Sequence, residues 1–452
     1  MHFHAISLQR RLGWSGACAL LLAACGAAVC RPRDVSGEYG PAPVIGPPDK
    51  HLIPTLHTAK AIGWRAGEAP TPADGTEVHA FARDLAHPRW IYVLPNGDVL
   101  VAESEAPPKP DDAKGIFGKA RKLVMKRAGS GARPSADRIT LLRDVHGSFP
   151  ERHTFVQGLH SPIGMALVGD NFYVADTDAL LRFTYHTGET ELRGQPTEVA
   201  ALPAGTINHH WTKSLIASLD GSKLFVGVGS NSNAAENGLA VEAERSSVWE
   251  IDPRTGSHRV FASGLRNPVG LAFEPQSGDL WVAVNERDEL GDHLPPDYMT
   301  ALRDGAFYGW PFSYYGAHVD DRVQPQNPAM VARTVAPDYA LGAHTASLGL
   351  CWSADTTLPP PFRHGMFVGQ HGSWNRRTRS GYKVVFVSFA AGKPTGLPID
   401  VLTGFLDDKG RASGRPVGVA IDTRGALLVA DDVGGTIWRV TRAGEVSRDA
   451  AR

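Results

Sequence analysis

The chain has 452 residues and a formal net charge of −1, from 46 basic and 47 acidic side chains. This balance provides no overall field that would hold nucleic acid or an anionic surface, so a small neutral partner is favoured. The 49 glycines and 33 prolines stand between short apolar runs, which is typical of many strands joined by turns.

The N-terminus has the pattern of an export signal. Arg10 and Arg11 precede an apolar run, residues 17–24, that is too short to span a bilayer as a helix. The run ends in Leu22-Ala23-Ala24-Cys25, which resembles the bacterial lipoprotein cleavage box. We therefore expect residues 1–24 to be removed and Cys25 to be acylated, which would anchor the protein to a membrane in the periplasm. An ordinary secretory signal, cut at a small residue, is the alternative.

Residues 25–75 are rich in Pro, Gly and Ala and have weak periodicity, so they are predicted to be a tether with a little local order. The main body is expected over residues 76–445, followed by a tail at 446–452. The four cysteines are too few for a disulfide scaffold, and no Cys/His spacing indicates a zinc site. A Cys30–Cys351 disulfide is compatible with the sequence, but no other feature supports it.

One pattern recurs six times in the main body. A turn leads into a short strand, a turn with Gly or Asp follows, and a second apolar strand comes next. The six predicted strand pairs are Pro88–Val93 with Val99–Glu103, Pro162–Leu167 with Phe172–Asp176, Ser214–Ser218 with Leu224–Gly227, Pro268–Phe273 with Leu280–Val284, Ser347–Trp352 with Gly365–Gly369, and Pro416–Ile421 with Leu427–Asp431.

Six copies at irregular spacing predict an all-β fold, a single six-bladed β-propeller with loop insertions. One hairpin cannot bury its face alone, whereas a closed ring lets every blade bury both faces. The strand near Val78 is expected to complete the last blade beside Thr436–Val440 and so to close the ring. A β-sandwich or two smaller β-domains are the alternatives, but no linker divides the body.

Two of the repeats begin with residues whose side chains could take part in catalysis. His209-His210 opens the third copy, and an imidazole is the usual group for taking a proton near neutral pH. Arg266-Asn267 opens the fourth copy, and two strong donors side by side suit a carbonyl or an oxyanion. The structural alternatives are histidines that only pack and an arginine that ties adjacent blades together.

An acidic insertion is predicted at residues 285–310. It begins with Asn285–Asp292, which holds four carboxylates in eight residues. Hard oxygen ligands in a loop suggest Ca²⁺, although the spacing is not that of an EF-hand and a solvated acidic turn is the alternative. Basic side chains follow in Gly369–Arg377 and Ser413–Pro416. Because all these loops flank inner strands, we expect them to converge on one mouth of the ring.

With these residues in hand, the chain resembles the soluble quinoprotein glucose dehydrogenase and sorbosone dehydrogenase family over most of residues 76–440. The specific points are Leu265–Phe273, Gly305–Pro311 and Gly369–Arg376. The runs His209–Thr212 and Asn285–Asp288 make the sorbosone-type branch the more similar one. The resemblance implies a propeller that binds pyrroloquinoline quinone (PQQ) over Ca²⁺ at the axial mouth and oxidises a sugar.

The resemblance also implies catalytic roles by position. His210 would be the general base that takes the proton of the substrate hydroxyl while a hydride passes to the quinone. Arg266 and Asn267 would donate to the quinone oxygen that gains charge.

Cofactor-binding roles follow from the same resemblance. The backbone carbonyls of Arg287 and Asp288 would bind the Ca²⁺ ion. Arg376 and Arg415 would contact the three carboxylates of PQQ, and His160 would be a polar contact in the second blade.

The sequence departs from the family pattern at several of these positions. The glucose-specific branch has a carboxylate beside the catalytic histidine, where this chain has His209, and it has Gly-Pro where this chain has Arg287-Asp288. A lactonase-like propeller hydrolase, in which Ca²⁺ alone activates water or substrate, is a competing prediction, as is a non-catalytic sugar-binding propeller. The first needs carboxylates and Asn side chains that converge on the metal, and the second needs no His210, Arg266 and Asn267 together.

Overall fold

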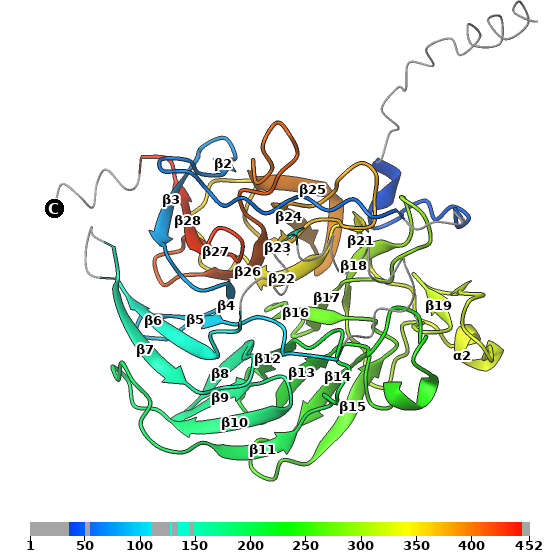
Figure 1. The fold of residues 1–452 in the computed structure, drawn as a ribbon, viewed down its shortest axis with the longest axis horizontal. Coiled ribbons are helices and arrows are strands. Elements are labelled where there is room, and N and C mark those ends of the chain that lie inside the picture. Colours follow the sequence, from blue (N-terminus) through cyan, green and yellow to red (C-terminus); the bar gives the residue numbers. More distant parts are fainter. Residues whose placement is uncertain (1–35, 50–54, 111–126, 129–133, 145–148, 445–452) are drawn as a thin grey trace, which may run out of the picture. The chain divides into compact units, whose positions relative to one another are not determined.

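A computed structural model describes residues 36–49, 55–110, 127–128, 134–144 and 149–444. The chain divides into two units, Met1–Ser36 and Gly37–Arg452, and the fold described here is that of the second. Six of its sheets are arranged as the blades of a β-propeller (Figure 1), as the repeats predict. The expected signal, Cys25 and the tail lie outside the described residues.

Each blade is built from antiparallel strands, and in blades one to three these follow one another in the sequence. Blades one to three are β4 (Pro88–Val93), β5 (Val99–Glu103), β6 (Arg138–Arg143) and β7 (Glu151–Gln157); β8 (Gly164–Val168), β9 (Asn171–Ala175), β10 (Ala179–Thr184) and β11 (Thr197–Ala201); and β12 (Lys213–Ala217), β13 (Leu224–Val228), β14 (Ser247–Ile251) and β15 (His258–Ser263).

Blades four to six include strands from the N-terminal part of the chain. They are β16 (Pro268–Phe273), β17 (Leu280–Val284), β18 (Pro296–Ala301), β21 (Tyr339–Ala343) and β1 (Tyr39–Gly40); β22 (Ser347–Trp352), β23 (Gly365–Gln370), β24 (Lys383–Ala390), β25 (Lys393–Thr403) and β2 (Thr71–Pro72); and β26 (Pro416–Ile421), β27 (Leu427–Asp431), β28 (Thr436–Arg442) and β3 (Thr76–Ala82).

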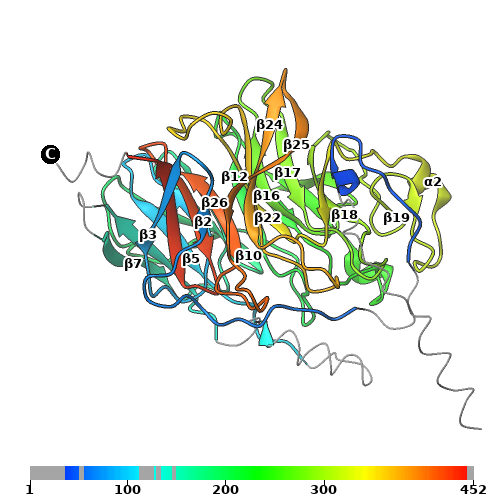
Figure 2. The ribbon, with the colours of Figure 1, turned by 90° about the horizontal axis from the view of Figure 1, so that it is seen from above.

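Short elements complete the described residues. A 3-10 turn, η1 (Ser36–Glu38), precedes β1, and another, η2 (Leu239–Glu242), lies between β13 and β14. The hairpin β19 (Ser313–Tyr314) and β20 (His318–Val319) and the short helix α2 (Pro328–Ala332) lie beside blade four (Figure 2). The helix starts at Asn327, whose side chain accepts a hydrogen bond from the Met330 amide.

The ring closes between the two ends of the main body. β3 pairs antiparallel with β28, with Val78 opposite Val440, and Figure 2 shows blue β3 among the red strands of the last blade. The predicted closure is therefore confirmed. The inner strands β4, β8, β12, β16, β22 and β26 contact one another in that cyclic order around the axis.

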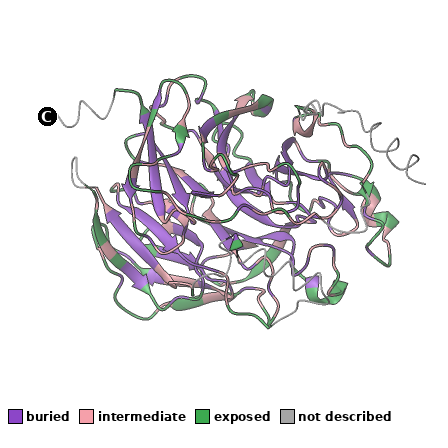
Figure 3. Cartoon of the chain, turned by 45° about the horizontal axis from the view of Figure 1, so that its top comes forward, coloured by how far each residue is buried: buried purple, intermediate pink, exposed green. Residues whose placement is uncertain are grey.

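Burial follows the position of each strand in its blade (Figure 3). The second strands β5, β13, β17 and β27 are buried along their whole length, and they read as continuous apolar runs. The outer strand β11 has no buried residue. Both faces of a second strand pack against neighbouring blades, which explains why these runs carry the clearest signal in the sequence.

The stretch predicted to be a tether also carries strands and anchors. β1 extends blade four and β2 extends blade five. The ring of Tyr39 lies against Gly342, where an added Cβ would come within 2.4 Å of it. The indole of Trp64 donates to the buried carboxylate of Asp431 at 2.7 Å and meets the ring of Trp438 edge to face.

Trp64→Phe is expected to lower the free energy of unfolding by about 1–3 kcal/mol, because a buried carboxylate loses a hydrogen-bond donor. Burial raises the pKa of Asp431 to about 6, against the donors that lower it. The folded state therefore holds the proton more tightly than the unfolded state, and the contribution of Asp431 to stability falls between about pH 4 and pH 6.

The lost N–H bond favours the ionised carboxylate, so the Trp64→Phe cost should be larger at pH 8 than at pH 5. Urea unfolding at the two pH values measures it. Trp352→Phe is the matched control, since its indole donates no hydrogen bond within the described residues. Equal costs for the two variants at pH 8 would contradict the anchoring role of Trp64.

Three further expectations can be compared with the structure. The acidic insertion is not a single loop, because β18 lies within residues 285–310 as the third strand of blade four. Cys351 is a free thiol, and Cys30 lies outside the described residues. Among the described residues, no helix is long and apolar enough to cross a membrane.

Candidate active site

The residues expected to converge do lie at one end of the ring, here called the mouth. Each inner strand begins at the mouth and each second strand returns to it, as the register Pro268 opposite Val284 illustrates for blade four. Loops that precede an inner strand or follow a second strand therefore meet there. A separate cavity of about 310 Å³ lies at the other end of blades four and five, lined by residues that include Glu274 and Trp352, and it contains none of the predicted site residues.

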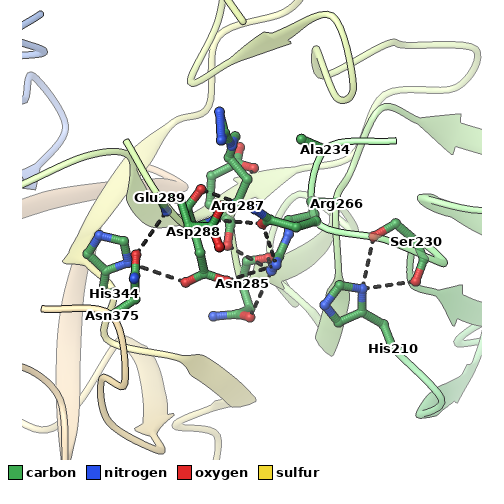
Figure 4. A network of polar contacts seen from close by, with 12 residues as sticks. His210, Ser230, Ala234, Arg266, Asn285, Arg287, Asp288, Glu289, His344 and Asn375 are labelled. Carbon is green, nitrogen blue, oxygen red and sulfur yellow. Dashed lines mark hydrogen bonds and ion pairs between the residues drawn. The ribbon is translucent and has the colours of Figure 1, made fainter. Parts of the chain in front are cut away.

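His210 precedes β12 and is held by the loop that follows β13. Its Nδ1 lies 2.9 Å from both the carbonyl and the hydroxyl oxygen of Ser230 (Figure 4). The Ser230 hydroxyl donates to the carbonyl of Ser232 at 2.6 Å, so its oxygen is left to accept. Nδ1 must therefore carry the proton, and Nε2 of the neutral ring keeps a lone pair.

The electrostatic surroundings keep this ring neutral. Burial, with the nearby Arg266 and His209 acting in the same direction, holds the pKa of His210 well below its usual 6.5. A neutral imidazole with a bare Nε2 can accept a proton, which is the property a general base requires. The adjacent His209 instead lies 3.1 Å from the amine of Lys109.

Asn267 lies close to His210 because both pack on Gly229. A Cβ added to Gly229 would lie 2.4 Å from Cβ of His210 and 2.5 Å from Oδ1 of Asn267. That Oδ1 is buried and has no hydrogen-bond partner. The sequence-predicted base and one predicted donor are thus neighbours, and Oδ1 of Asn267 is an unsatisfied polar atom of this pair.

Arg266 is buried and its terminal nitrogens are already engaged. One donates to the carbonyl of Glu286 at 2.8 Å, and the other to Oδ1 of Asn233 and Oδ2 of Asp288, both at 2.9 Å (Figure 4). Its Nε is buried without a partner. Arg266 therefore organises the loop after β17, and its Nε is the donor that remains for a ligand.

The loop predicted to bind Ca²⁺ is held by Asn233. This amide accepts from the Asp288 N–H at 2.8 Å and donates to the Asp288 carbonyl at 3.2 Å. The side chain of Arg287 points elsewhere, with its guanidinium 2.5 Å from the carboxylate of Asp320. Burial raises the pKa of Glu286 to about 7.

His344 ties this loop to blade five. Its Nε2 lies 2.8 Å from the Gly291 carbonyl and its Nδ1 lies 3.4 Å from Oδ1 of Asp288. Both partner groups are hydrogen-bond acceptors. Burial alone would lower the pKa of His344, but Asp288 and the Gly291 carbonyl raise it above its usual value.

A second group of polar residues joins blades one, five and six. Asp432 accepts from Arg89 at 2.6 Å and from Nε2 of His371 at 2.8 Å. Arg89 also lies over the ring of Trp211, the residue after His210, at 5.8 Å. The contacts thus continue around the mouth from His210 to His371, whose pKa burial lowers to about 4.

Arg415 belongs to this second group. It donates to the carbonyls of His371 at 3.0 Å and Gly372 at 3.1 Å, and its guanidinium lies 5.1 Å from the ring centre of Tyr382. Among the described residues, no carboxylate pairs with its guanidinium. Arg415 is therefore a buried cation at the mouth that is available to an anionic ligand.

The structure places Arg376 and His160 differently. Arg376 pairs with Glu38 at 2.8 Å and also donates to the Ala343 carbonyl, so its charge is already met by the N-terminal segment. His160 begins the loop before β8 at the mouth end, but its half-exposed ring pairs with Asp178 at 2.8 Å. Neither side chain contacts the His210 group through a described hydrogen bond.

Several residues of the site were not singled out from the sequence. Gly229, Ser230 and Asn233 follow β13, and Asp432 follows β27. The rule that loops after second strands reach the mouth could have found them, since the pairs β12–β13 and β26–β27 were predicted. No sequence signal indicates that His344 pairs with Asp288.

These features define a six-bladed propeller with a polar, partly unsatisfied site at one mouth. The model of the TrAA12-like family matches residues 137–295 and 318–443, more than half of the chain. The chain belongs to this family. The predicted resemblance to quinoprotein sugar dehydrogenases is thereby confirmed, while the sorbosone-type branch stays a prediction.

Known relatives agree with this assignment. The "pyrroloquinoline quinone-dependent sugar dehydrogenase" of Hypocrea jecorina is 22% identical over 82% of this chain and 89% of its own length. The calcium structure of a Trichoderma reesei family AA12 enzyme superposes with a TM-score of 0.67 and 19% identity, covering 86% of this chain and 99% of that one.

A third relative is the pyranose dehydrogenase of Coprinopsis cinerea. The holo form of its PQQ domain superposes with a TM-score of 0.65 and 20% identity over 85% of this chain and 100% of that domain. In the full-length enzyme, the match is 26% identical but spans only 40% of the relative's length. At these identities, the superpositions establish the fold.

Proposed function

We propose that this protein is a PQQ- and Ca²⁺-dependent oxidoreductase that oxidises a sugar, an aldose or an aldehyde-sugar such as sorbosone. The observation that carries the proposal is the geometry of His210, whose Nδ1 proton is held by Ser230 while Nε2 stays bare beside Arg266 and Asn267. Relatives named as PQQ-dependent sugar dehydrogenases support the cofactor and the substrate class.

The residues at the mouth fit PQQ, which is a planar quinone with three carboxylates. Arg415 offers a buried positive charge without a carboxylate partner among the described residues. Nε of Arg266 and Oδ1 of Asn267 are buried polar atoms that lack partners. Such groups are costly unless a ligand or water satisfies them, so they favour a polar ligand here.

The loop after β17 fits Ca²⁺. Backbone carbonyls at Arg287 and Asp288, with the buried carboxylates of Asp288 and Glu286 close by in sequence, are oxygen donors of the kind that Ca²⁺ prefers. The calcium structure of the Trichoderma reesei relative supports this assignment.

In the proposed reaction, the chain supplies position and proton transfer. Bound PQQ, polarised by Ca²⁺, would supply the two-electron acceptor for the hydride that leaves the sugar carbon. Nε2 of His210 takes the proton of the sugar hydroxyl, and Ser230 stabilises the ring through Nδ1 as it becomes charged. Arg266 and Asn267 hold two polar atoms without partners near that ring, Nε of Arg266 and Oδ1 of Asn267.

The competing functions lack matching features. A lactonase-like site needs side-chain carboxylates around an axial metal, and within the described ranges no three His, Cys, Asp or Glu side chains form a metal-binding group. A sugar-binding propeller without catalysis has no need of a neutral histidine whose tautomer is fixed by a serine.

The decisive experiment mixes the purified apoprotein with PQQ and Ca²⁺. We expect quinone absorbance to appear on the protein and a dye to be reduced when an aldose is added. Omission of Ca²⁺ should weaken PQQ binding. No binding of PQQ at micromolar concentration would contradict the proposal.

Arg415→Ala is expected to weaken PQQ binding by roughly 10- to 100-fold, because a charge-assisted hydrogen bond contributes about 1.5–3 kcal/mol. Arg376→Ala should weaken it less, since Arg376 already pairs with Glu38. Quenching of tryptophan fluorescence by PQQ measures both affinities. Arg259→Ala, which removes a surface cation paired with Asp304, controls for the loss of one charge. Equal effects of Arg415→Ala and Arg259→Ala would refute the role of Arg415.

For the cellular location, we propose export to the periplasm and attachment to a membrane through acylated Cys25. The support is the Leu22-Ala23-Ala24-Cys25 sequence after a basic and apolar start. Mass spectrometry of the mature N-terminus tests it, and an unmodified first residue other than Cys25 would overturn it.

A further inference from the structure

The loop that holds His210 is itself held from behind by one short segment. Residues 229–232 follow β13 and carry the groups that meet Nδ1 of His210. The segment behind them contains η2 and Arg245. Arg245 donates to the carbonyl of Gly229 at 3.4 Å and to Oδ1 of Asn208 at 3.0 Å. The side chain of Asn208, two residues before His210, and the carbonyl of Gly229, just before Ser230, are thus tied to this segment.

Glu242, the last residue of η2, supplies the other contacts. One carboxylate oxygen accepts the hydroxyl of Ser232, and the other accepts the N–H of Asn231 at 2.7 Å. Ser232 in turn accepts the Ser230 hydroxyl on its carbonyl at 2.6 Å. Glu242 is therefore connected to Nδ1 of His210 through Ser232 as a residue, whose hydroxyl donates to Glu242 and whose carbonyl accepts from Ser230.

The direction of each bond in this chain matters. The Ser230 hydroxyl donates to the Ser232 carbonyl and the Ser232 hydroxyl donates to Glu242, because a carbonyl and a carboxylate can only accept. The Ser230 oxygen is left as an acceptor, which requires the proton on Nδ1. The Ser230 carbonyl, also 2.9 Å from Nδ1, favours the same tautomer. If the loop moved so that this carbonyl left Nδ1 and the Ser230 hydroxyl turned to donate to Nδ1, the proton of the neutral ring would move to Nε2, and the ring could no longer act as a base there.

Glu242 is suited to this task by its surroundings. It is 8% exposed, so water does not compete for its oxygens. Burial raises its pKa, while the Ser232 hydroxyl, the Asn231 amide and Arg245 act in the opposite direction. Glu236 is the other charge near it. A carboxylate offers two acceptors at once, which neither Gln nor Ala can do.

We propose that Glu242 is a positioning residue for His210: it fixes Ser230 and Ser232 so that the imidazole keeps its proton on Nδ1 and presents a bare Nε2 at the mouth. The value of this role for turnover rests on the function proposed above. The tautomer itself does not, because it is a property of the protein without cofactor or sugar.

The first test measures the tautomer directly. Histidine side chains labelled with ¹⁵N report by NMR which ring nitrogen carries the proton, and the His210→Asn spectrum identifies the His210 signals. We expect Nδ1–H alone in the native protein and a mixture with Nε2–H in Glu242→Gln. An unchanged Nδ1–H tautomer in Glu242→Gln would overturn the proposal.

The second test uses turnover of the PQQ- and Ca²⁺-loaded enzyme. Loss of a supporting carboxylate is expected to lower kcat by roughly 10- to 100-fold with little change in KM, and to alter the acid limb of the pH profile. Glu274→Gln is the matched control, since Glu274 is also buried and accepts backbone N–H bonds, from Gln276 and Ser277, at the other end of blade four. Equal losses in the two variants would overturn the proposal.

A third variant covers the case in which Glu242→Gln does not fold. Ser232→Ala removes the bond to one carboxylate oxygen and leaves the bond from Asn231 in place. It should shift the tautomer in the same direction, and a native spectrum would count against Glu242. If the tautomer shifts but the native protein never binds PQQ, the proposed function fails while the positioning role stands.

Discussion

His210→Ala is expected to lower kcat by about 10²- to 10⁴-fold, the usual contribution of a general base, while PQQ still binds. The reason is the bare Nε2 that the hydrogen bond from Nδ1 to Ser230 leaves on the ring. Stopped-flow reduction of bound PQQ by an aldose measures the rate. Full activity of the variant would show that another group takes the proton.

The pH dependence of the rate is a second test of His210 as the general base. Burial, Arg266 and His209 hold the pKa of His210 well below 6.5, and the base works when it is unprotonated. The rate should therefore stay level as the pH falls through 6.5 and decline only at clearly lower pH. His209→Ala removes one of the groups that lower this pKa and leaves Ser230 in place, so it should move the midpoint toward 6.5. A midpoint at or above 6.5 would contradict the neutral, buried ring.

Gly229→Ala is expected to reduce turnover by roughly 100-fold, because displacement of catalytic groups by about 1 Å has an effect of this size. The new methyl group would lie 2.4 Å from Cβ of His210 and 2.5 Å from Oδ1 of Asn267, so both side chains must shift. Steady-state kinetics and tryptophan fluorescence of the folded protein measure activity and structure side by side.

The matched control is Gly46→Ala, since no atom lies within 4 Å of a Cβ at that position. It should behave like the native protein in both measurements. Native kcat in Gly229→Ala would mean that His210 and Asn267 do not need their observed places for catalysis.

Much of the fold could be predicted because the strands bury both faces. Predicted pairs such as Pro268–Phe273 with Leu280–Val284 have the observed bounds. β18 was missed because it stands in an acidic stretch, and its own acid, Asp297, is buried and satisfied by the amides of Glu286 and Ser347. A carboxylate in a strand with such partners looks like a loop residue in the sequence.

The sequence could predict contacts in the site only between residues that precede the inner strands of adjacent blades. His210 and Asn267 meet because each precedes an inner strand of adjacent blades. The partner of Arg376 could not be foreseen, since Glu38 lies 338 residues away in a segment without periodicity. Glu242 has no motif at all, and its role depends on a loop conformation that only the structure gives.

The N-terminal strands have a consequence for how the protein can be handled. β1 and β2 cover part of the outer edges of blades four and five, where unpaired N–H and C=O groups of β21 and β25 would otherwise face outward. Open strand edges are templates for pairing between molecules. A shortened chain that starts at Thr76 would keep every inner strand, yet lose the contacts of Glu38 and Trp64 and expose two such edges. Such a chain should self-associate, so soluble preparations are best begun before Tyr39.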